Sequence, residues 1–151
     1  MTRRQRAYVF GLEDRFVCMA LTEREDEIGG LGWTTALDSL PADATDEQLG
    51  STVLEVLAQS GVAPPNPENV EKTVFRVAGV RSRRQLVRSA QLVPVNRVGK
   101  RIELQAWEQH LRSGGWTAPS ADPLYVLEDP EPAELGAMVR KAFAWFEDRE
   151  E

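Results

Sequence analysis

A run of apolar residues near the start of the chain constrains the possible folds most strongly. Residues 16–21 read FVCMAL, with no charged or strongly polar side chain among them. Successive side chains of a strand point to opposite faces, so this segment, as a strand, is apolar on both faces. Such a strand belongs inside a sheet that is covered on both sides. The β-rich run Tyr8-Val9-Phe10 precedes it across Gly11 to Arg15, and the two runs predict a β-hairpin.

A helix is predicted over about residues 46–60. Thr45 and Gln48 have the spacing of a capping box, in which the hydroxyl accepts a bond from a free amide and the side-chain amide reaches back. An apolar stripe at helical spacing follows, formed by Leu49, Val53, Val56 and Leu57. Gly61 is the natural end of this helix.

A second long helix is predicted over about residues 132–148, and it repeats part of the first. Leu135-Gly136-x-x-Val139-x-x-x-Phe143 matches Leu49-Gly50-x-x-Val53-x-x-x-Leu57 at an offset of 86 residues. Glycine in a helix costs up to about 1 kcal/mol relative to alanine. Two glycines at the same place in the stripe therefore predict close packing of helix backbone on the sheet.

The remaining segments predict shorter elements: a strand at 73–77, a basic helix near 82–90, a second hairpin from 91–95 and 101–106, and a last strand at 124–127. Segments 23–27 and 29–32 are predicted to be loops. Pro94 cannot donate a ladder hydrogen bond, so its strand is expected at a sheet edge or at a bulge.

Together these elements predict an α+β fold in a single domain over residues 1–151. We expect a mostly antiparallel sheet of about five or six strands, two longer helices (about 46–60 and 132–148) and a short helix near 82–90. Residues 1–6 are expected to be flexible.

The residues of common catalytic and metal sites are scarce. The chain has one cysteine, Cys18, and one histidine, His110, whereas a Cys/His zinc site needs about four such ligands. Phosphate-binding loops, nucleophile elbows and metalloprotease motifs are missing from the sequence. No apolar run approaches the roughly 18 residues of a membrane span. We therefore expect a cytoplasmic protein without catalysis, metal or cofactor. A small enzyme that uses an acid–base pair of carboxylates is left open as an alternative function.

Charge is distributed unevenly along the chain and gives two candidate contact surfaces. Residues 1–70 carry a net charge of −7, and residues 71–112 carry +7. The first candidate is an anionic patch for a cationic partner, formed by Glu23, Glu25, Asp26 and Glu27. The alternative is a nucleic-acid-binding module in the basic segment 72–101, with phosphate contacts from Arg81, Arg83, Arg84 and Arg88. No aromatic residue interrupts that arginine run for base stacking, and nucleic acid is the less favoured partner.

Four segments, in this order and spacing, resemble a known family. They are Leu37-Asp38-Ser39-Leu40-Pro41 leading into Thr45 to Gly50, Gly79 to Leu86 with Val93-Pro94-Val95, Gly114-Gly115-Trp116, and Pro132-Ala133-Glu134-Leu135-Gly136. The pattern resembles the immunity proteins of bacterial contact-dependent growth inhibition (CDI) systems. The resemblance implies a small cytosolic α+β protein without catalytic activity. It also implies a 1:1 complex with the toxic C-terminal domain of a cognate effector, which in such systems is often a nuclease.

Overall fold

The computed structural model describes residues 4–23, 31–110, 112, 115–118 and 122–149. Its first half contains strands β1 (Arg4–Gly11), β2 (Arg15–Glu23) and β3 (Leu31–Pro41), followed by helices α1 (Asp46–Gln59), α2 (Val70–Ala78) and α3 (Arg83–Ser89). Its second half contains β4 (Gln91–Val98), β5 (Arg101–Leu104), β6 (Glu108–His110), β7 (Gly115–Thr117), β8 (Tyr125–Glu128) and α4 (Pro132–Arg149). The predicted α+β class is confirmed.

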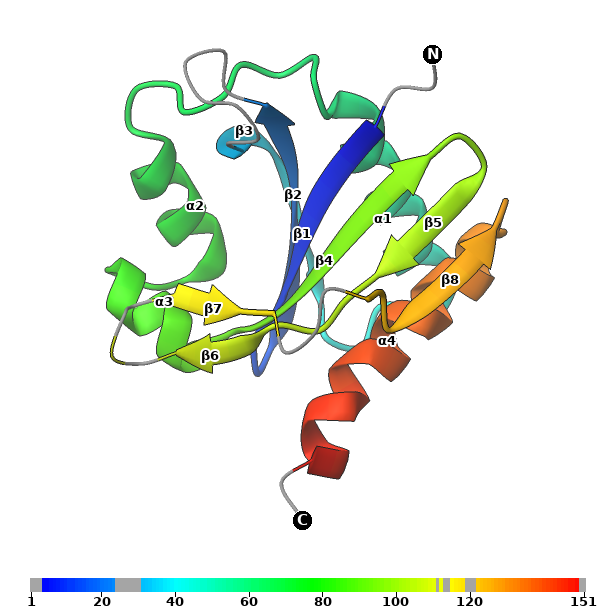
Figure 1. The fold of residues 1–151 in the computed structure, drawn as a ribbon. Coiled ribbons are helices and arrows are strands. Elements are labelled where there is room, and N and C mark those ends of the chain that lie inside the picture. Colours follow the sequence, from blue (N-terminus) through cyan, green and yellow to red (C-terminus); the bar gives the residue numbers. More distant parts are fainter. Residues whose placement is uncertain (1–3, 24–30, 111, 113–114, 119–121, 150–151) are drawn as a thin grey trace.

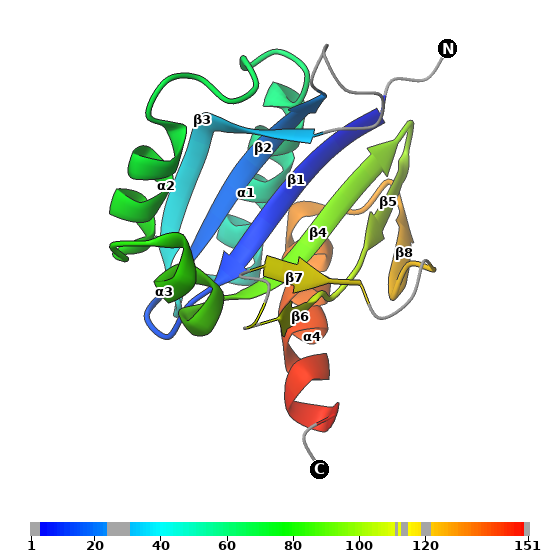
Figure 2. The ribbon, with the colours of Figure 1, turned by 60° about the vertical axis from the view of Figure 1, so that its left-hand side comes forward.

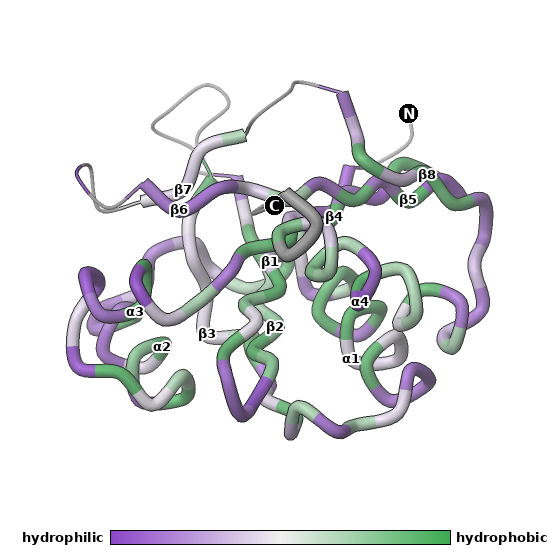
Figure 3. Tube along the Cα trace, turned by 90° about the horizontal axis from the view of Figure 1, so that it is seen from below, coloured by the Kyte–Doolittle hydropathy of each residue, from purple (hydrophilic) through white to green (hydrophobic). Residues whose placement is uncertain are grey.

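The main sheet has six antiparallel strands in the order β3-β2-β1-β4-β5-β8, and β6 and β7 form a separate two-stranded ribbon. Helices α1 and α4 cover one face of the sheet (Figure 1). Helices α2 and α3 and the β6–β7 ribbon lie on the opposite face (Figure 2). The view from below shows the two helix pairs on either side of strands β1 and β2, where the hydrophobic residues gather (Figure 3).

Strand β2 lies inside this covered sheet, as its composition predicts. Phe16, Cys18 and Ala20 point into the core under α1 and α4. Val17, Met19 and Leu21 point into the second core, under α2 and α3. The turn between β1 and β2 closes with a hydrogen bond from Leu12 N to Arg15 O at 2.9 Å, and the predicted first hairpin is confirmed.

The capping box of α1 is also confirmed. The Thr45 hydroxyl accepts a hydrogen bond from Gln48 N at 3.1 Å, and Thr45 N donates to Gln48 Oε1 at 2.9 Å. These two bonds satisfy amides that the first turn of a helix cannot pair internally. The predicted stripe of Leu49, Val53, Val56 and Leu57 is buried.

The two glycines of the repeated stripe are where the structure corrects our interpretation. We predicted that Gly50 and Gly136 bring helix backbone close to the sheet, but they bring α1 and α4 close to each other. A Cβ placed on Gly50 would lie 1.7 Å from Pro132 O, and one placed on Gly136 would lie 1.8 Å from Asp46 O. Helices α1 and α4 therefore cross at Gly50 and Gly136. The leucines that precede these glycines, Leu49 and Leu135, face the core.

Two segments differ from the predicted secondary structure. Residues 73–77, predicted as a strand, lie within α2, whose buried residues Val70, Val74 and Ala78 follow helical spacing. Strand β3 was not predicted, and it includes Leu31 and Gly32 of the expected 29–32 loop. A strand there gives β2 the antiparallel partner that covers its outer edge.

Pro94 lies in an interior strand, contrary to the predicted edge position. Its carbonyl accepts a hydrogen bond from Gln105 N at 3.0 Å, on the side of β4 that faces β5. The amide and carbonyl of one strand residue point to the same side, so the missing N–H of Pro94 also faces β5. Strand β5 ends at Leu104, one residue before Gln105. The missing N–H of Pro94 therefore removes no hydrogen bond from the regular pairing of β4 with β5.

Candidate binding surface

The main sheet opens between β1 and β2 at one end. Arg6 and Leu21 are the last paired residues of the two strands. Beyond them, β1 continues to pair only with β4, as far as Arg4, and β2 pairs only with β3, as far as Glu23. The expected flexible start, residues 1–6, is thus in part a strand from Arg4 onward.

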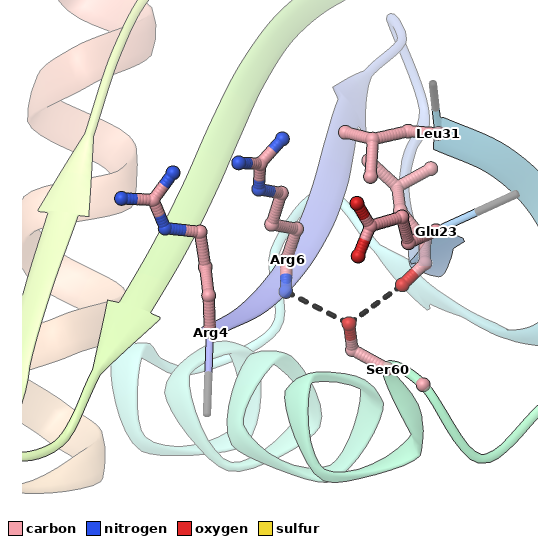
Figure 4. Close-up of a pocket in the computed structure, with 7 residues that line it drawn as sticks. Arg4, Arg6, Glu23, Leu31 and Ser60 are labelled. Atoms are coloured by element: carbon pink, nitrogen blue, oxygen red, sulfur yellow. Dashed lines mark hydrogen bonds between the residues drawn. The ribbon is translucent and has the colours of Figure 1, made fainter. Parts of the chain in front are cut away.

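Ser60, the residue that ends α1, closes the opening between the strands. Its hydroxyl accepts a hydrogen bond from Arg6 N at 2.9 Å and donates one to Leu21 O at 2.6 Å (Figure 4). Next to it, the Thr22 hydroxyl accepts from Gly61 N at 3.0 Å and donates to Ala63 O at 2.6 Å. Ser60 is only 4% exposed, so backbone groups freed by the divergence are satisfied inside the protein.

Two adjoining cavities lie over this opening. The first, of about 230 Å³, is lined by Arg4, Arg6, Leu21, Glu23, Leu31, Ser60 and Gly61. The second, of about 200 Å³, is lined by Arg6, Ala7, Tyr8, Leu21, Leu31, Pro94, Asn96, Gln105 and Trp107. Because the two share Arg6, Leu21 and Leu31, we treat them as one feature and call it the groove. Figure 4 shows the side chains of Arg4, Arg6 and Glu23 in its first part.

Among the described residues, the first part of the groove has more positive than negative side chains. Two arginines and one carboxylate, that of Glu23, line its first part. Within the described part of the chain, neither the Arg4 nor the Arg6 guanidinium forms a salt bridge. Burial lowers the pKa of Arg6, the nearby Arg4 charge lowers it further, and Glu23 opposes the change. An anionic group entering here would meet two guanidinium groups that hold several donors each.

The inner part of the groove is aromatic. The Tyr8 and Trp107 rings meet edge to face with centroids 5.8 Å apart. Trp107 Nε1 donates to Gln105 Oε1 at 2.9 Å, so the polar atom of the indole is satisfied. Burial raises the pKa of Tyr8, and the charges of Arg6 and Arg83 oppose that rise. The groove therefore combines a charged mouth with an apolar wall, which is the composition of many protein-binding surfaces.

The structure describes one member of the predicted acidic set. Glu23 lines the groove, whereas Glu25, Asp26 and Glu27 lie outside the described residues. The acidic patch thus stays a prediction, of which one member is now placed.

The predicted basic set lies on and beside α3. Arg81, Arg83, Arg84 and Arg88 are all exposed. Arg83 stacks over the Trp33 ring at 5.3 Å, and its Nη1 lies 3.9 Å from Glu71 Oε1. Helix α3 is followed closely by Gln91, which pairs with Gly11. Gly11 is the end of β1 that lies away from the groove. Of this set, the charge of Arg83 acts on Tyr8 in the groove.

The other singled-out residues have ordinary surroundings. Cys18 is fully buried, and burial raises the pKa of its thiol to about 12. His110 lies exposed on β6. Among the residues that the structure describes, no cluster of three or more His, Cys, Asp or Glu side chains could hold a metal ion. None of the described helices has the length and apolar character needed to cross a membrane.

The sequence interpretation missed the groove. Arg4, Arg6 and Tyr8 alternate along β1, and this period of two places them on one face. That signal was present, but β1 was predicted only from Tyr8 onward. The partners across the groove, Leu31 and Trp107, come from distant segments, and no local pattern connects them with β1.

Comparison with known proteins identifies the family and the fold. Among curated proteins, no significant match to the chain was found. The chain is similar in structure to a protein of unknown function from Neisseria meningitidis, with a TM-score of 0.73 and 21% identity, covering 95% of each chain. It is also similar to a CdiA-CT/CdiI toxin and immunity complex from Yersinia pseudotuberculosis, with a TM-score of 0.72 and 17% identity, covering 94% of this chain and 97% of that chain. At these identities the structural matches show a shared fold. The family model described as CDI immunity protein matches residues 29–145, and the chain therefore belongs to the CDI immunity protein family.

Proposed function

We propose that this protein binds the C-terminal toxin domain of a cognate CDI effector in a 1:1 complex and thereby neutralises it. The observation that carries the proposal is the family match over residues 29–145. The fold shared with a Yersinia pseudotuberculosis chain from a toxin and immunity complex supports it. The protein acts by occupying a surface of the toxin in the cytoplasm, and it needs no catalytic step or cofactor of its own.

Charge supports a contact with a cationic toxin surface. The protein has a formal net charge of −6, and four of its acidic residues, Glu23, Glu25, Asp26 and Glu27, are close together in the sequence. If the toxin is a nuclease, its phosphate-binding cleft is basic, and an acidic surface speeds the encounter with such a cleft. We propose these four residues as a toxin contact.

The nucleic-acid-binding alternative gains no support from the family match. Nucleic-acid binding can be tested with the same protein, because the arginines on and beside α3 are exposed.

Co-expression with the toxin domain encoded beside this protein tests the proposal. We expect cells to survive the toxin when they make this protein, and to die when they make an immunity protein from an unrelated system. Titration calorimetry with the purified partners should give one binding site per chain and a dissociation constant near 1 nM or below, which corresponds to about −12 kcal/mol. The absence of both rescue and complex formation would overturn the proposal. Salt-sensitive binding of DNA or RNA instead, lost in Arg81→Ala and Arg84→Ala variants, would favour the alternative.

A further inference from the structure

We infer that the groove receives a carboxylate-bearing segment of the toxin domain, with Arg4 and Arg6 as charge partners and the Tyr8–Trp107 pair as the apolar contact. This inference rests on the proposed function, and it names the surface and the chemistry of the bound segment.

Among the elements that the structure describes, none covers part of the sheet face beside the groove. Helices α2 and α3 and the β6–β7 ribbon cover the β3–β2 side and the lower part of this face (Figure 2). Among the described elements, none lies over the upper parts of β1, β4 and β5 in that view. Val126, on the edge strand β8, is 49% exposed.

The strand register shows which side chains share this open face. Directly paired residues on neighbouring strands have their side chains on the same face. One row across the sheet consists of Arg6, Asn96, Glu103 and Val126. The next row consists of Arg4, Val98, Arg101 and Glu128. The groove therefore continues into an uncovered surface that reaches the edge strand β8.

The charges along these rows favour an anionic ligand at the two arginines. Arg101 and Glu103 pair with each other at 2.9 Å, so their charges are compensated within the protein. Arg4 and Arg6 stand at the other end of the rows, and no described carboxylate forms a salt bridge with either of them. Burial lowers the pKa of Arg6, and repulsion from the Arg4 charge lowers it further. A carboxylate placed between them would relieve this repulsion and could accept paired hydrogen bonds from a guanidinium.

The carboxylates on this face favour a protein segment over a nucleic acid. Glu23 and Glu128 lie on the same face as the two arginines, and they would repel a continuous chain of phosphates. A protein segment can present one carboxylate to the arginines and uncharged or basic groups to these glutamates. Tyrosine, tryptophan and arginine together are the residue types that contribute most to protein interfaces.

Charge reversal in the full-length protein tests the inference. We expect Arg4→Glu and Arg6→Glu each to raise the dissociation constant for the toxin domain about 30-fold or more, measured by calorimetry. The matched control is Lys141→Glu on α4, which makes the same change in net charge on the opposite side of the sheet. We expect this control to change the dissociation constant less than about threefold.

Further variants and measurements separate a loss of binding from a loss of folding. Arg6→Gln removes the charge without reversing it, and circular dichroism shows whether each variant keeps its wild-type melting temperature. A toxin variant in which one carboxylate is replaced by arginine should restore binding to the Arg6→Glu protein. Hydrogen exchange of the wild-type complex should show slower exchange of the amides of residues 95–98 and 101–103 than in the free protein.

The outcomes separate this inference from the proposed function. Wild-type affinity in both folded charge-reversal variants, or exchange protection confined to other surfaces, overturns the groove as the toxin site and leaves the immunity role standing. Loss of oligonucleotide binding in these variants, with toxin binding intact, assigns the groove to nucleic acid and also overturns the inference. Failure of the wild-type protein to bind the toxin domain overturns both.

Discussion

Gly50 of α1 and Gly136 of α4 face each other where the two helices cross, and neither position has room for a side chain. A Cβ on Gly50 would lie 3.0 Å from Gly136 N as well as 1.7 Å from Pro132 O. The contacted atoms are backbone, which cannot turn aside as a flexible side chain can. Arg140 of α4 reinforces the contact through its Nε, 2.7 Å from Asp46 Oδ1, and through bonds to the carbonyls of Ala42 and Ala44.

Alanine at either glycine should therefore destabilise the fold. Alanine has the higher helix propensity, by up to about 1 kcal/mol, but separating the helices costs more. We expect Gly50→Ala and Gly136→Ala to lower the free energy of unfolding by about 2 kcal/mol, measured by urea denaturation. Gly115→Ala is the control, because nothing lies within 4 Å of a Cβ at that position. Variants as stable as the wild type would show that the helices are not held in this close contact.

The Ser60 hydroxyl should contribute both to stability and to the closure of the sheet. In Ser60→Ala, Arg6 N and Leu21 O would lose their bridging partner inside the protein. We expect a loss of about 1–3 kcal/mol in the free energy of unfolding, and faster hydrogen exchange at the Arg6 amide. Ser89→Ala, at an exposed position at the end of α3, should change neither quantity measurably. Unchanged exchange at Arg6 in Ser60→Ala would contradict the bridging role.

Cys18 should be unreactive until the protein unfolds. Burial raises the pKa of its thiol from the usual 9.0 to about 12, so the nucleophilic thiolate is suppressed at neutral pH. We expect the rate of labelling by a thiol reagent to follow unfolding as urea is added. Rapid labelling of the native protein at pH 8 would disprove this.

The same shift gives a pH dependence of stability. Between pH 9 and 12 the unfolded thiol loses its proton and the folded thiol keeps it, so the unfolded state gains stability. The Cys18 contribution to folding is therefore complete below pH 9 and falls as the pH rises towards 12. Cys18→Ala should show a shallower loss of stability than the wild type in alkaline urea titrations.

Charge reversal of the acidic set should slow association with the toxin domain. Lysine at Glu23, Glu25, Asp26 and Glu27 would remove the proposed attraction, and we expect an association rate constant at least about tenfold lower at low salt. The difference should shrink as salt is added, because exposed charges are screened. Alanine at Arg81, Arg84 and Arg88 is the comparison, and we expect it to leave the affinity unchanged. The reverse pattern would place the contact on the α3 side.

Local sequence signals predicted the elements that local interactions determine. Thr45 and Gln48 identify the start of α1 because the capping bonds join residues three apart. Residues 16–21 identify a covered strand because burial on both faces leaves no polar position. The segment 73–77 was misread because its valines and phenylalanine favour strands, while the helical period that buries Val70, Val74 and Ala78 extends beyond it.

The groove could not be predicted in the same way. It lies where β1 and β2 diverge beyond Arg6 and Leu21, and a hydroxyl supplied by the end of α1 bridges the two strands there. The strand order that places β4 beside β1 is likewise a long-range arrangement. The same holds for the position of Pro94 beside the end of β5, where its missing N–H removes no regular hydrogen bond. The arginine alternation in β1 is visible in the sequence, but its meaning depends on these distant partners.

The double role of Ser60 couples the length of α1 to the geometry of the sheet. Each residue of an α-helix turns the chain by about 100°, so one insertion between Thr45 and Ser60 would rotate the hydroxyl away from both strands. A homologue with a longer or shorter first helix would therefore have to close the strand opening with another group, or else rejoin β1 and β2 and lose the groove.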